Sequence, residues 1–281
     1  MKKRYFLIIM IAALSLMNPL AMAESWEFAV FGDTRSNSAA DSGVNAAAIT
    51  AITSDISTNR NASFAIFVGD LVYGNGNVNS IATQLDNFKT AAANGGFKVA
   101  GTTGAGIPYY PVRGNHDNNT VDPLGVAWNA AFSTLPQNGP TTNTSGGGNS
   151  EVGMTYSFVN DNSLFLGLDE YINRGTYPNQ VNQTWVDSQL SGSTAAHVFA
   201  FGHDPAYQVS HADCLAAHPT ERDAFLTSLY DNSGLIYFAG HDHLTTVARA
   251  NIGGDPDQVF YPVVIGAGGA PGASFGGSYP D

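Results

Sequence analysis

Short runs of apolar, aromatic and β-branched residues recur along the chain, separated by longer segments with apolar residues at helical spacing. The runs have the length and composition of buried β-strands. We predict such strands at residues 26–31, 63–69, 108–112, 163–168, 196–202 and 235–240. We predict helices at residues 44–58, 78–93 and 179–190 and directly after Pro219. Strands that alternate with helices indicate an α/β fold built in layers.

The last part of the chain has a different pattern. Two apolar runs, at 244–250 and 258–268, follow each other with only turn residues between them. This spacing predicts antiparallel strands, so we expect a mixed sheet. An earlier low-complexity segment, 137–150, is interpreted as a surface loop and not as a linker between domains, because strand–helix alternation resumes after it.

Composition narrows the class of protein. The chain has 281 residues, of which 43% are hydrophobic and 12% are charged, so it can bury a substantial core. Its formal net charge of −12 argues against nucleic acid or anionic lipid as a general binding partner. The single cysteine, Cys214, cannot form an internal disulfide, and we assign it a packing role without chemistry.

The first 23 residues have the organisation of a secretory signal peptide. Basic residues precede a short apolar run that ends in an A-x-A sequence at 21–23, which predicts cleavage after Ala23 and export. The alternative is a transmembrane anchor, but Asn18 and Pro19 interrupt a run that is already short. We therefore expect a periplasmic or extracellular protein with one domain over 24–281 and no membrane anchor after cleavage.

Polar residues of a few chemical kinds follow the predicted strands, each with a glycine directly before it or one position away. They are Asp33, Asp70, Asn115 with His116, His203, and His241 with His243. In open α/β sheets ligands bind outside the carboxyl ends of the strands, so we expect these side chains to share one site.

The residue types indicate which ligand this site takes. Imidazole, carboxylate and amide oxygen together suit Zn, Fe or Mn. The set is too large for one ion and fits a pair about 3.5–4 Å apart, bridged by one carboxylate. Each residue alone also has an ordinary interpretation, as a packed histidine or part of a tight turn, so the prediction depends on the whole set.

Five motifs resemble, in kind and in order, those of the calcineurin-like metallophosphoesterases. They are GD at 32–33, GD at 69–70, GNHD at 114–117, GH at 202–203 and GHDH at 240–243. The resemblance covers residues 28–243. It implies a sandwich of two mixed β-sheets flanked by helices, and a dinuclear centre that hydrolyses phosphate esters through attack by a metal-bound hydroxide.

The resemblance also implies a role for each matching residue. It implies Asp33 and His243 as ligands of a first metal, Asp70 as the bridge, and Asn115, His203 and His241 as ligands of a second metal. His116 resembles the family's proton donor or transition-state stabiliser.

Arg35 departs from the family pattern, which usually has a histidine two positions after the first aspartate. An arginine cannot ligate a metal, because its guanidinium has no available lone pair. Purple acid phosphatases also lack this histidine and supply a tyrosine three positions after the bridging aspartate, where this chain has Tyr73. The resemblance to that subgroup implies a Tyr73 phenolate on Fe, paired with Zn, Mn or Fe. The alternative for Tyr73 is ordinary aromatic packing.

Two residues are candidates for contact with substrate. His211, which follows GHDPAY at 202–207, resembles the substrate-side histidine of purple acid phosphatases. Arg35 has a planar fork that suits bidentate binding of phosphate. An ion pair between Arg35 and a nearby aspartate, which would order the loop, is an equal alternative.

The expected function is therefore an acid-phosphatase-like hydrolase of small phosphate monoesters. A phosphodiesterase acting on nucleotides or phospholipid head groups is one alternative. A non-catalytic metal- or phosphate-binding protein on the same scaffold is an alternative of another class. The resemblance also implies another strand or two after the final residues SYPD, so truncation at the C-terminus is one interpretation.

Overall fold

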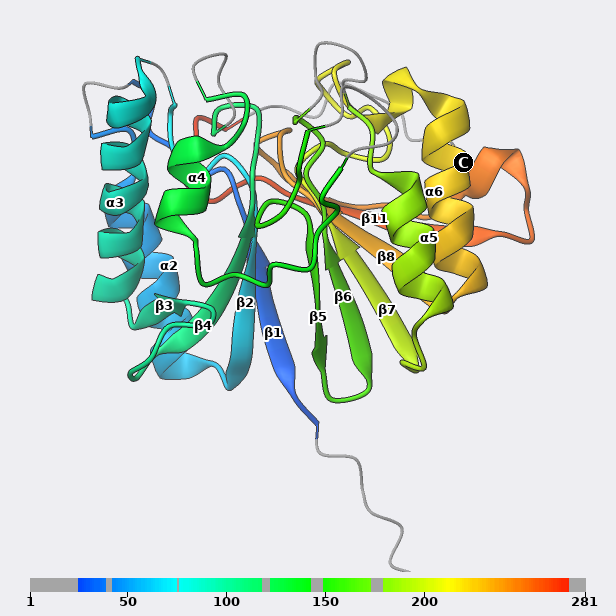
Figure 1. Ribbon diagram of the computed structural model, residues 1–281, viewed down its shortest axis with the longest axis horizontal. Coiled ribbons are helices and arrows are strands. Elements are labelled where there is room, and N and C mark those ends of the chain that lie inside the picture. Colours follow the sequence, from blue (N-terminus) through cyan, green and yellow to red (C-terminus); the bar gives the residue numbers. More distant parts are fainter. Residues whose placement is uncertain are drawn as a thin grey trace, which may run out of the picture.

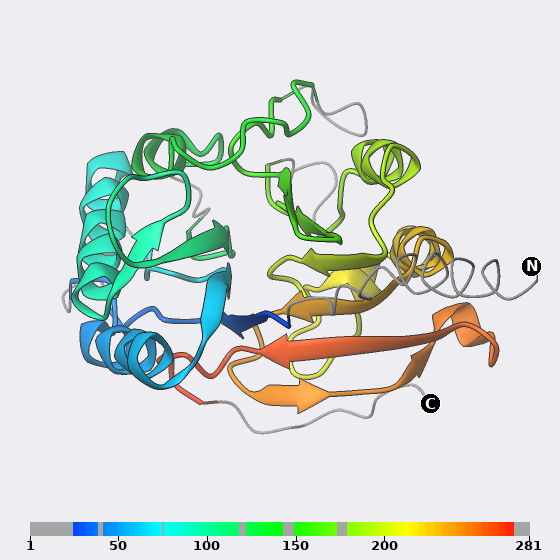
Figure 2. The ribbon, with the colours of Figure 1, turned by 90° about the horizontal axis from the view of Figure 1, so that it is seen from below.

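The computed structural model describes residues 25–38, 42–74, 76–117, 122–142, 149–172 and 179–272. Within these ranges the chain forms two β-sheets that pack on each other, with helices on their outer sides (Figure 1). Figure 2 shows the same arrangement from below, with α2, α3 and α4 beside one sheet and α5 and α6 beside the other.

The first sheet has four parallel strands in the order β1-β2-β4-β3. The strands are β1 (Glu27–Phe31), β2 (Ala62–Val68), β3 (Phe97–Val99) and β4 (Ile107–Val112). The helices on this side are α2 (Ala46–Asn59), α3 (Val78–Asn94) and α4 (Val126–Ala131). Asn45 caps α2 by accepting a hydrogen bond from the backbone of Ala48, and Asn77 caps α3 in the same way through Ser80.

The second sheet has seven strands in the order β10-β11-β8-β7-β6-β5, with β9 also paired to β11. The strands are β5 (Tyr156–Asn160), β6 (Ser163–Gly167), β7 (His197–Phe201), β8 (Gly234–Ala239), β9 (Thr245–Val247), β10 (Ala250–Asn251) and β11 (Val259–Ile265). The helical segments are α5 (Gln183–Ser191), α6 (Pro219–Asp231) and the 3₁₀ turns η2 (Leu215–Ala217) and η3 (Ile252–Gly254). The central strands are parallel, whereas β5, β9 and β10 are antiparallel to their neighbours.

The predicted α/β sandwich is confirmed, and so are the late antiparallel strands. One detail differs, because the four-stranded sheet is parallel throughout and not mixed. Its strands β1, β2 and β3 are joined by the crossover helices α2 and α3, which return the chain to the same end each time. The strands β3 and β5 were not predicted, since β3 has only three residues and β5 exposes part of its length.

Aromatic rings fill the space between the two sheets. Phe28 of β1 stacks on Phe64 of β2 with ring centroids 5.3 Å apart. Phe165 of β6 meets both rings edge to face, at 5.3 Å and 5.1 Å. Such pairs add stabilisation beyond the area that they bury, and they hold the sheets together below the strand ends.

A buried ion pair joins the sheets at their upper edge. Arg113, directly after β4, pairs with Asp169, shortly after β6, and both side chains are fully buried. Asp169 also accepts hydrogen bonds from the backbone of Tyr171 and Ile172, at 2.8 Å and 2.9 Å. The pair therefore ties the loop that carries Asn115 to the second sheet.

Several sequence predictions concern the ends of the chain or its only thiol. Cys214 is fully buried, and burial raises the pKa of its thiol to about 12, which agrees with a packing role. Across the residues that the structure describes, none of the helices has the length and apolarity needed to cross a bilayer. The predicted signal peptide, residues 1–23, the central part of the predicted loop, 143–148, and the C-terminal residues 273–281 lie outside the described residues.

The ion pair between the sheets gives a stability prediction. Arg113→Met leaves the Asp169 carboxylate buried without its partner, so we expect a loss of about 3–5 kcal/mol in the free energy of unfolding. Arg60→Met is the control, since it breaks a solvent-exposed pair with Asp55, and exposed pairs contribute little to stability. Urea denaturation measures both values. Equal, small losses in the two variants would show that the buried pair does not join the sheets.

Candidate metal centre

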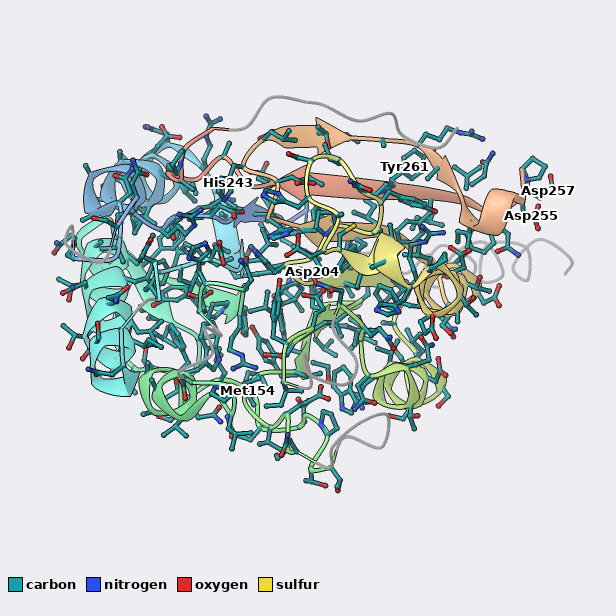
Figure 3. All side chains as sticks on the ribbon, turned by 90° about the horizontal axis from the view of Figure 1, so that it is seen from above. Met154, Asp204, His243, Asp255, Asp257 and Tyr261 are labelled. Carbon is teal, nitrogen blue, oxygen red and sulfur yellow. The ribbon has the colours of Figure 1, made fainter. Side chains whose placement is uncertain are left out.

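The strand ends of both sheets bring the candidate ligands to one edge of the sandwich. Figure 3 views the molecule from above and labels one of these residues, His243. They follow β1 (Asp33), β2 (Asp70), β4 (Asn115 and His116), β7 (His203) and β8 (His241 and His243). The structure therefore brings together the five strand ends that carry the candidate ligands.

The backbone is unusual at four of these residues. Asp33, Asp70, His241 and His243 have positive φ values of 56°, 52°, 70° and 40°. This left-handed conformation is uncommon for residues with a side chain and costs free energy, so the surrounding contacts must impose it. Strain of this kind, repeated at four neighbouring positions, indicates that the loops are shaped to direct these side chains.

Two glycines let the loops approach the side chains closely. A Cβ atom on Gly114 would lie 2.3 Å from Asp70 Oδ1 and 2.9 Å from His203 Cε1. A Cβ atom on Gly240 would lie 2.5 Å from Asp33 Oδ2. Any larger residue at these positions would push the carboxylates out of place, which accounts for glycine in the motifs.

His203 presents a lone pair to two oxygen acceptors. Its Nδ1 lies 2.7 Å from the carbonyl oxygen of Val68, which can only accept, so Nδ1 carries the hydrogen. The bare Nε2 lies 3.1 Å from Asn115 Oδ1 and 3.4 Å from Asp70 Oδ1. Burial lowers the pKa of His203 to about 3, so the ring is neutral at ordinary pH. Three acceptors that face one another without a hydrogen between them can bind a cation.

Asp33 and His243 form a second arrangement of the same kind. His243 Nδ1 lies 2.9 Å from the carbonyl oxygen of Pro271, so its bare Nε2 faces Asp33 Oδ1 at 3.4 Å. Among the described residues, Asp33 Oδ1 has no hydrogen-bond partner, although the side chain is fully buried. Burial and the neighbouring Asp70 raise the pKa of Asp33 well above its usual value. A bound cation would stabilise this carboxylate.

Asp70 lies between the two arrangements. Its Oδ1 atom accepts a hydrogen bond from the backbone of His116 at 2.9 Å and faces His203. Burial raises the pKa of Asp70, but the nearby His203 and His116, the backbone hydrogen bond from His116 and the charge of Arg35 together leave the pKa lowered. Ligand atoms of Asp33, Asp70 and His203 lie within 4.8 Å of one another, so these residues can hold a metal ion.

His241 is positioned by an acidic residue that the sequence did not single out. Its Nε2 lies 3.3 Å from Asp213 Oδ1, and its ring centroid lies 5.1 Å from that of His203. Burial lowers the pKa of His241, but the hydrogen bond to Asp213 and the charges of the nearby aspartates together outweigh burial and leave the pKa raised. When Nε2 carries the hydrogen toward Asp213, Nδ1 is the nitrogen left to bind a metal.

His116 and Tyr73 lie next to each other at the rim. His116 Nδ1 is 2.7 Å from the carbonyl oxygen of Tyr73, and its Nε2 is 4.0 Å from Asp70 Oδ2. The Tyr73 ring centroid is 5.5 Å from that of His116. Within the described part of the chain, the Tyr73 hydroxyl makes no hydrogen bond to Asp33, Asp70 or His243, so a ligand role for Tyr73 stays a prediction.

The two candidate substrate residues also border the site. His211 is partly exposed, its ring lies 4.5 Å from that of His241, and its Nδ1 lies 2.7 Å from Asp242 Oδ1. Arg35 donates from Nε to Asp70 Oδ2 at 3.2 Å, so the ion pair that the sequence left as an alternative is present. Contact of either residue with substrate stays a prediction.

Buried acids behind the ligands were not identified from the sequence. Asp117 accepts hydrogen bonds from the backbone of Leu71, Val72 and Gly114, which fixes the Asp70 loop against the Asn115 loop. Burial raises the pKa of Asp117 to about 7. Glu170 accepts from the backbone of His203 at 2.8 Å. Asp117 belongs to the GNHD motif and could have been proposed, whereas nothing in the sequence distinguishes Glu170.

Comparison with known families agrees with this geometry. The family model of the calcineurin-like phosphoesterases matches residues 27–244. The chain belongs to this family. This membership confirms the resemblance that the motifs predicted. A comparison with curated proteins found no match.

Solved structures of several other proteins have a similar fold. The purple acid phosphatase PPD1 from seeds of yellow lupin (Lupinus luteus) aligns with a TM-score of 0.58 and 17% identity over 90% of this chain. GAP50, described as the anchor in the inner membrane complex of Plasmodium, aligns with a TM-score of 0.52 and 16% identity over 90% of this chain and 75% of its own. PhoD aligns with a TM-score of 0.52 and 10% identity over 80% of this chain and 52% of its own. The alignment spans only 46% of the lupin protein's length.

The burial of Asp33 gives a test of the site that does not depend on activity. Asp33→Asn keeps an acceptor for the backbone of His241 and adds a donor toward His243 Nε2, while it removes a buried charge. The pKa of Asp33 is higher in the folded protein than in the unfolded chain. The metal-free wild type therefore loses stability as the pH rises from the unfolded pKa through the folded pKa, whereas the variant has no such carboxyl and does not. We expect the variant to be more stable than the wild type in EDTA and to gain less stability from added Mn²⁺. Urea denaturation measures this, and a variant that is less stable in EDTA would contradict it.

Proposed function

We propose that this chain is an exported, metal-dependent hydrolase of small phosphate monoesters. The observation that carries the proposal is the group of acceptors on Asp70, Asn115 and His203, which face one another without a hydrogen between them. Family membership supplies the reaction class, and the pattern of residues 1–23 supports export. The acidic net charge favours a small substrate over nucleic acid.

Two transition metal ions, Fe with Zn, Mn or Fe, are part of the proposal. Asp33, His243 and Tyr73 would hold the first ion, Asp70 would be shared, and Asn115, His203 and His241 would hold the second. The metals would supply Lewis-acid activation of phosphate oxygens and of water at neutral pH. The carbonyl oxygen of Val68 keeps the hydrogen of His203 on Nδ1. Nε2 therefore has a free lone pair and can bind a metal without first losing a proton.

His116 is proposed as the proton donor to the leaving oxygen. The carbonyl oxygen of Tyr73 fixes the hydrogen on Nδ1, so a second proton on Nε2 is the one available for transfer. Nε2 lies 4.0 Å from Asp70 Oδ2 at the partly exposed rim, which supports a position beside the proposed metals. His211 borders the same edge and is proposed to contact the phosphate.

The fold does not decide between catalysis and binding, because one protein of this fold is described as an anchor. The alternative of a non-catalytic binding protein is disfavoured by the presence of the whole ligand set together with His116. The phosphodiesterase alternative differs only in the substrate, so a panel of monoesters and diesters separates the two.

Chelation tests the proposal most simply. Treatment with EDTA followed by desalting is expected to abolish hydrolysis of a chromogenic monoester, and added Mn²⁺ or Zn²⁺ is expected to restore it. Asp70→Ala removes the shared ligand, so we expect its activity to stay at background with any metal. Full activity of the metal-free protein would contradict the proposal, and faster turnover of diesters would favour the phosphodiesterase.

The role of His116 predicts a dependence on the leaving group. A general acid contributes about 10²–10⁴-fold, and most when the leaving oxygen is basic. We expect His116→Ala to lower kcat strongly for alkyl phosphates and far less for nitrophenyl phosphate. An equal loss on both substrates would show that His116 only positions the site.

A further inference from the structure

The backbone of Arg35 is held by two neighbouring segments of the chain. Its backbone N–H donates to the carbonyl oxygen of Asp70 at 3.1 Å, and the residue forms an isolated β-bridge with Val44. The side chain is only 12% exposed. Arg35 is therefore built into the loop that follows Asp33, and its guanidinium lies inside the candidate metal centre.

The guanidinium contacts two atoms that a first metal would need. Nε donates to Asp70 Oδ2 at 3.2 Å, and Nη2 lies 3.4 Å from the bare Nε2 of His243. Nη1 donates to the carbonyl oxygen of Ser36 at 3.3 Å, which sets the plane of the fork. Arg35 donates hydrogens and has no lone pair to give, so it cannot be a metal ligand. It nevertheless contacts Asp70 Oδ2 and His243 Nε2, which the first metal would use as ligand atoms.

The position of the second metal, beside Asn115, His203 and His241, has no basic side chain that competes in this way among the described residues. Across the described ranges, no lysine or arginine donates a hydrogen bond to Asn115, His203 or His241. The oxygen of Asp70 that faces His203 is Oδ1, whereas Arg35 binds Oδ2. The positive charge of Arg35 therefore lies on one side of the shared carboxylate.

We propose that the two metal positions are unequal because Arg35 competes with a cation for the first of them. An ion binds tightly among Asp70, Asn115 and His203. A second ion enters beside Asp33 and His243 only when the guanidinium leaves Asp70 Oδ2 and His243 Nε2. The guanidinium keeps its positive charge at every ordinary pH, so Arg35 competes as a cation throughout that range. This inference rests on the metal binding of the proposed function.

Arg35 also has a role when only the second metal position is occupied. The guanidinium then supplies positive charge at the place where the first metal would otherwise supply it. Its fork could pair with a phosphate oxygen from that place, since a charged guanidinium suits oxyanions.

Titration of the metal-stripped full chain with Mn²⁺ tests the inference directly. For the wild type we expect one tightly bound ion and a second that binds at least about tenfold more weakly, as charges a few ångströms apart near a protein surface require. Arg35→Gln removes the charge and should narrow this difference. Arg35→His supplies a ligand and should give two tightly bound ions, with the electron paramagnetic resonance signal of a coupled manganese pair.

Arg222→Gln is the matched control. Arg222 has the same 12% side-chain exposure and also pairs with an aspartate, Asp223, but on helix α6. This variant should bind Mn²⁺ as the wild type does, and circular dichroism confirms folding of all variants.

Three outcomes would overturn the inference. They are two ions of equal affinity in the wild type, a difference between the ions that persists in both Arg35 variants, and absence of any bound Mn²⁺. The last would also remove the metal dependence of the proposed function. Unequal binding without hydrolysis would refute only the proposed function, and hydrolysis with two equal ions would refute only the inference.

Discussion

The enforced proximity of buried lone-pair donors is the constraint on which the rest of this structure depends. Asp33 and Asp70 are buried beside each other, and each faces the bare Nε2 of a neutral histidine at 3.4 Å. Arg35 donates to Asp70 Oδ2 and reaches His243 Nε2, but the contacts of His203 with Asp70 and of His243 with Asp33 still set acceptor against acceptor in a region shielded from water. Such contacts are unfavourable unless a further cation binds. These contacts therefore lower the stability of the metal-free fold, and a bound cation would offset that loss.

The fold maintains this arrangement through contacts behind the site. Carbonyl oxygens of Val68 and Pro271 fix the hydrogens of His203 and His243 on Nδ1 and so keep Nε2 bare. The Asp117 carboxylate holds two ligand loops together through three backbone hydrogen bonds. Below these loops, the aromatic layer between the sheets supplies the rigid base that left-handed ligand residues require.

The sequence predicted which strand ends carry the candidate ligands, because each candidate follows a strand and the strand ends of a layered α/β fold converge. It could not predict the residues that orient them. Asp213 and Glu170 lie in loops without a motif, and only the tertiary structure brings them against His241 and His203. The sequence likewise raised both roles of Arg35 but could not choose, since its ion pair with Asp70 spans 35 residues of chain. The predicted helices 44–58 and 78–93 already indicated crossovers between parallel strands, but which strands share a sheet depends on tertiary contacts, so the wholly parallel first sheet was not predicted.

The central claim is that the acceptors of Asp70, Asn115 and His203 form a cation site. Diffraction from crystals grown with Mn²⁺, measured for anomalous scattering, tests this without reference to any reaction. The account predicts the strongest anomalous peak among these three side chains, with Asp70 in contact through Oδ1. Well-ordered crystals with no peak there, or with peaks only at surface carboxylates, would contradict it.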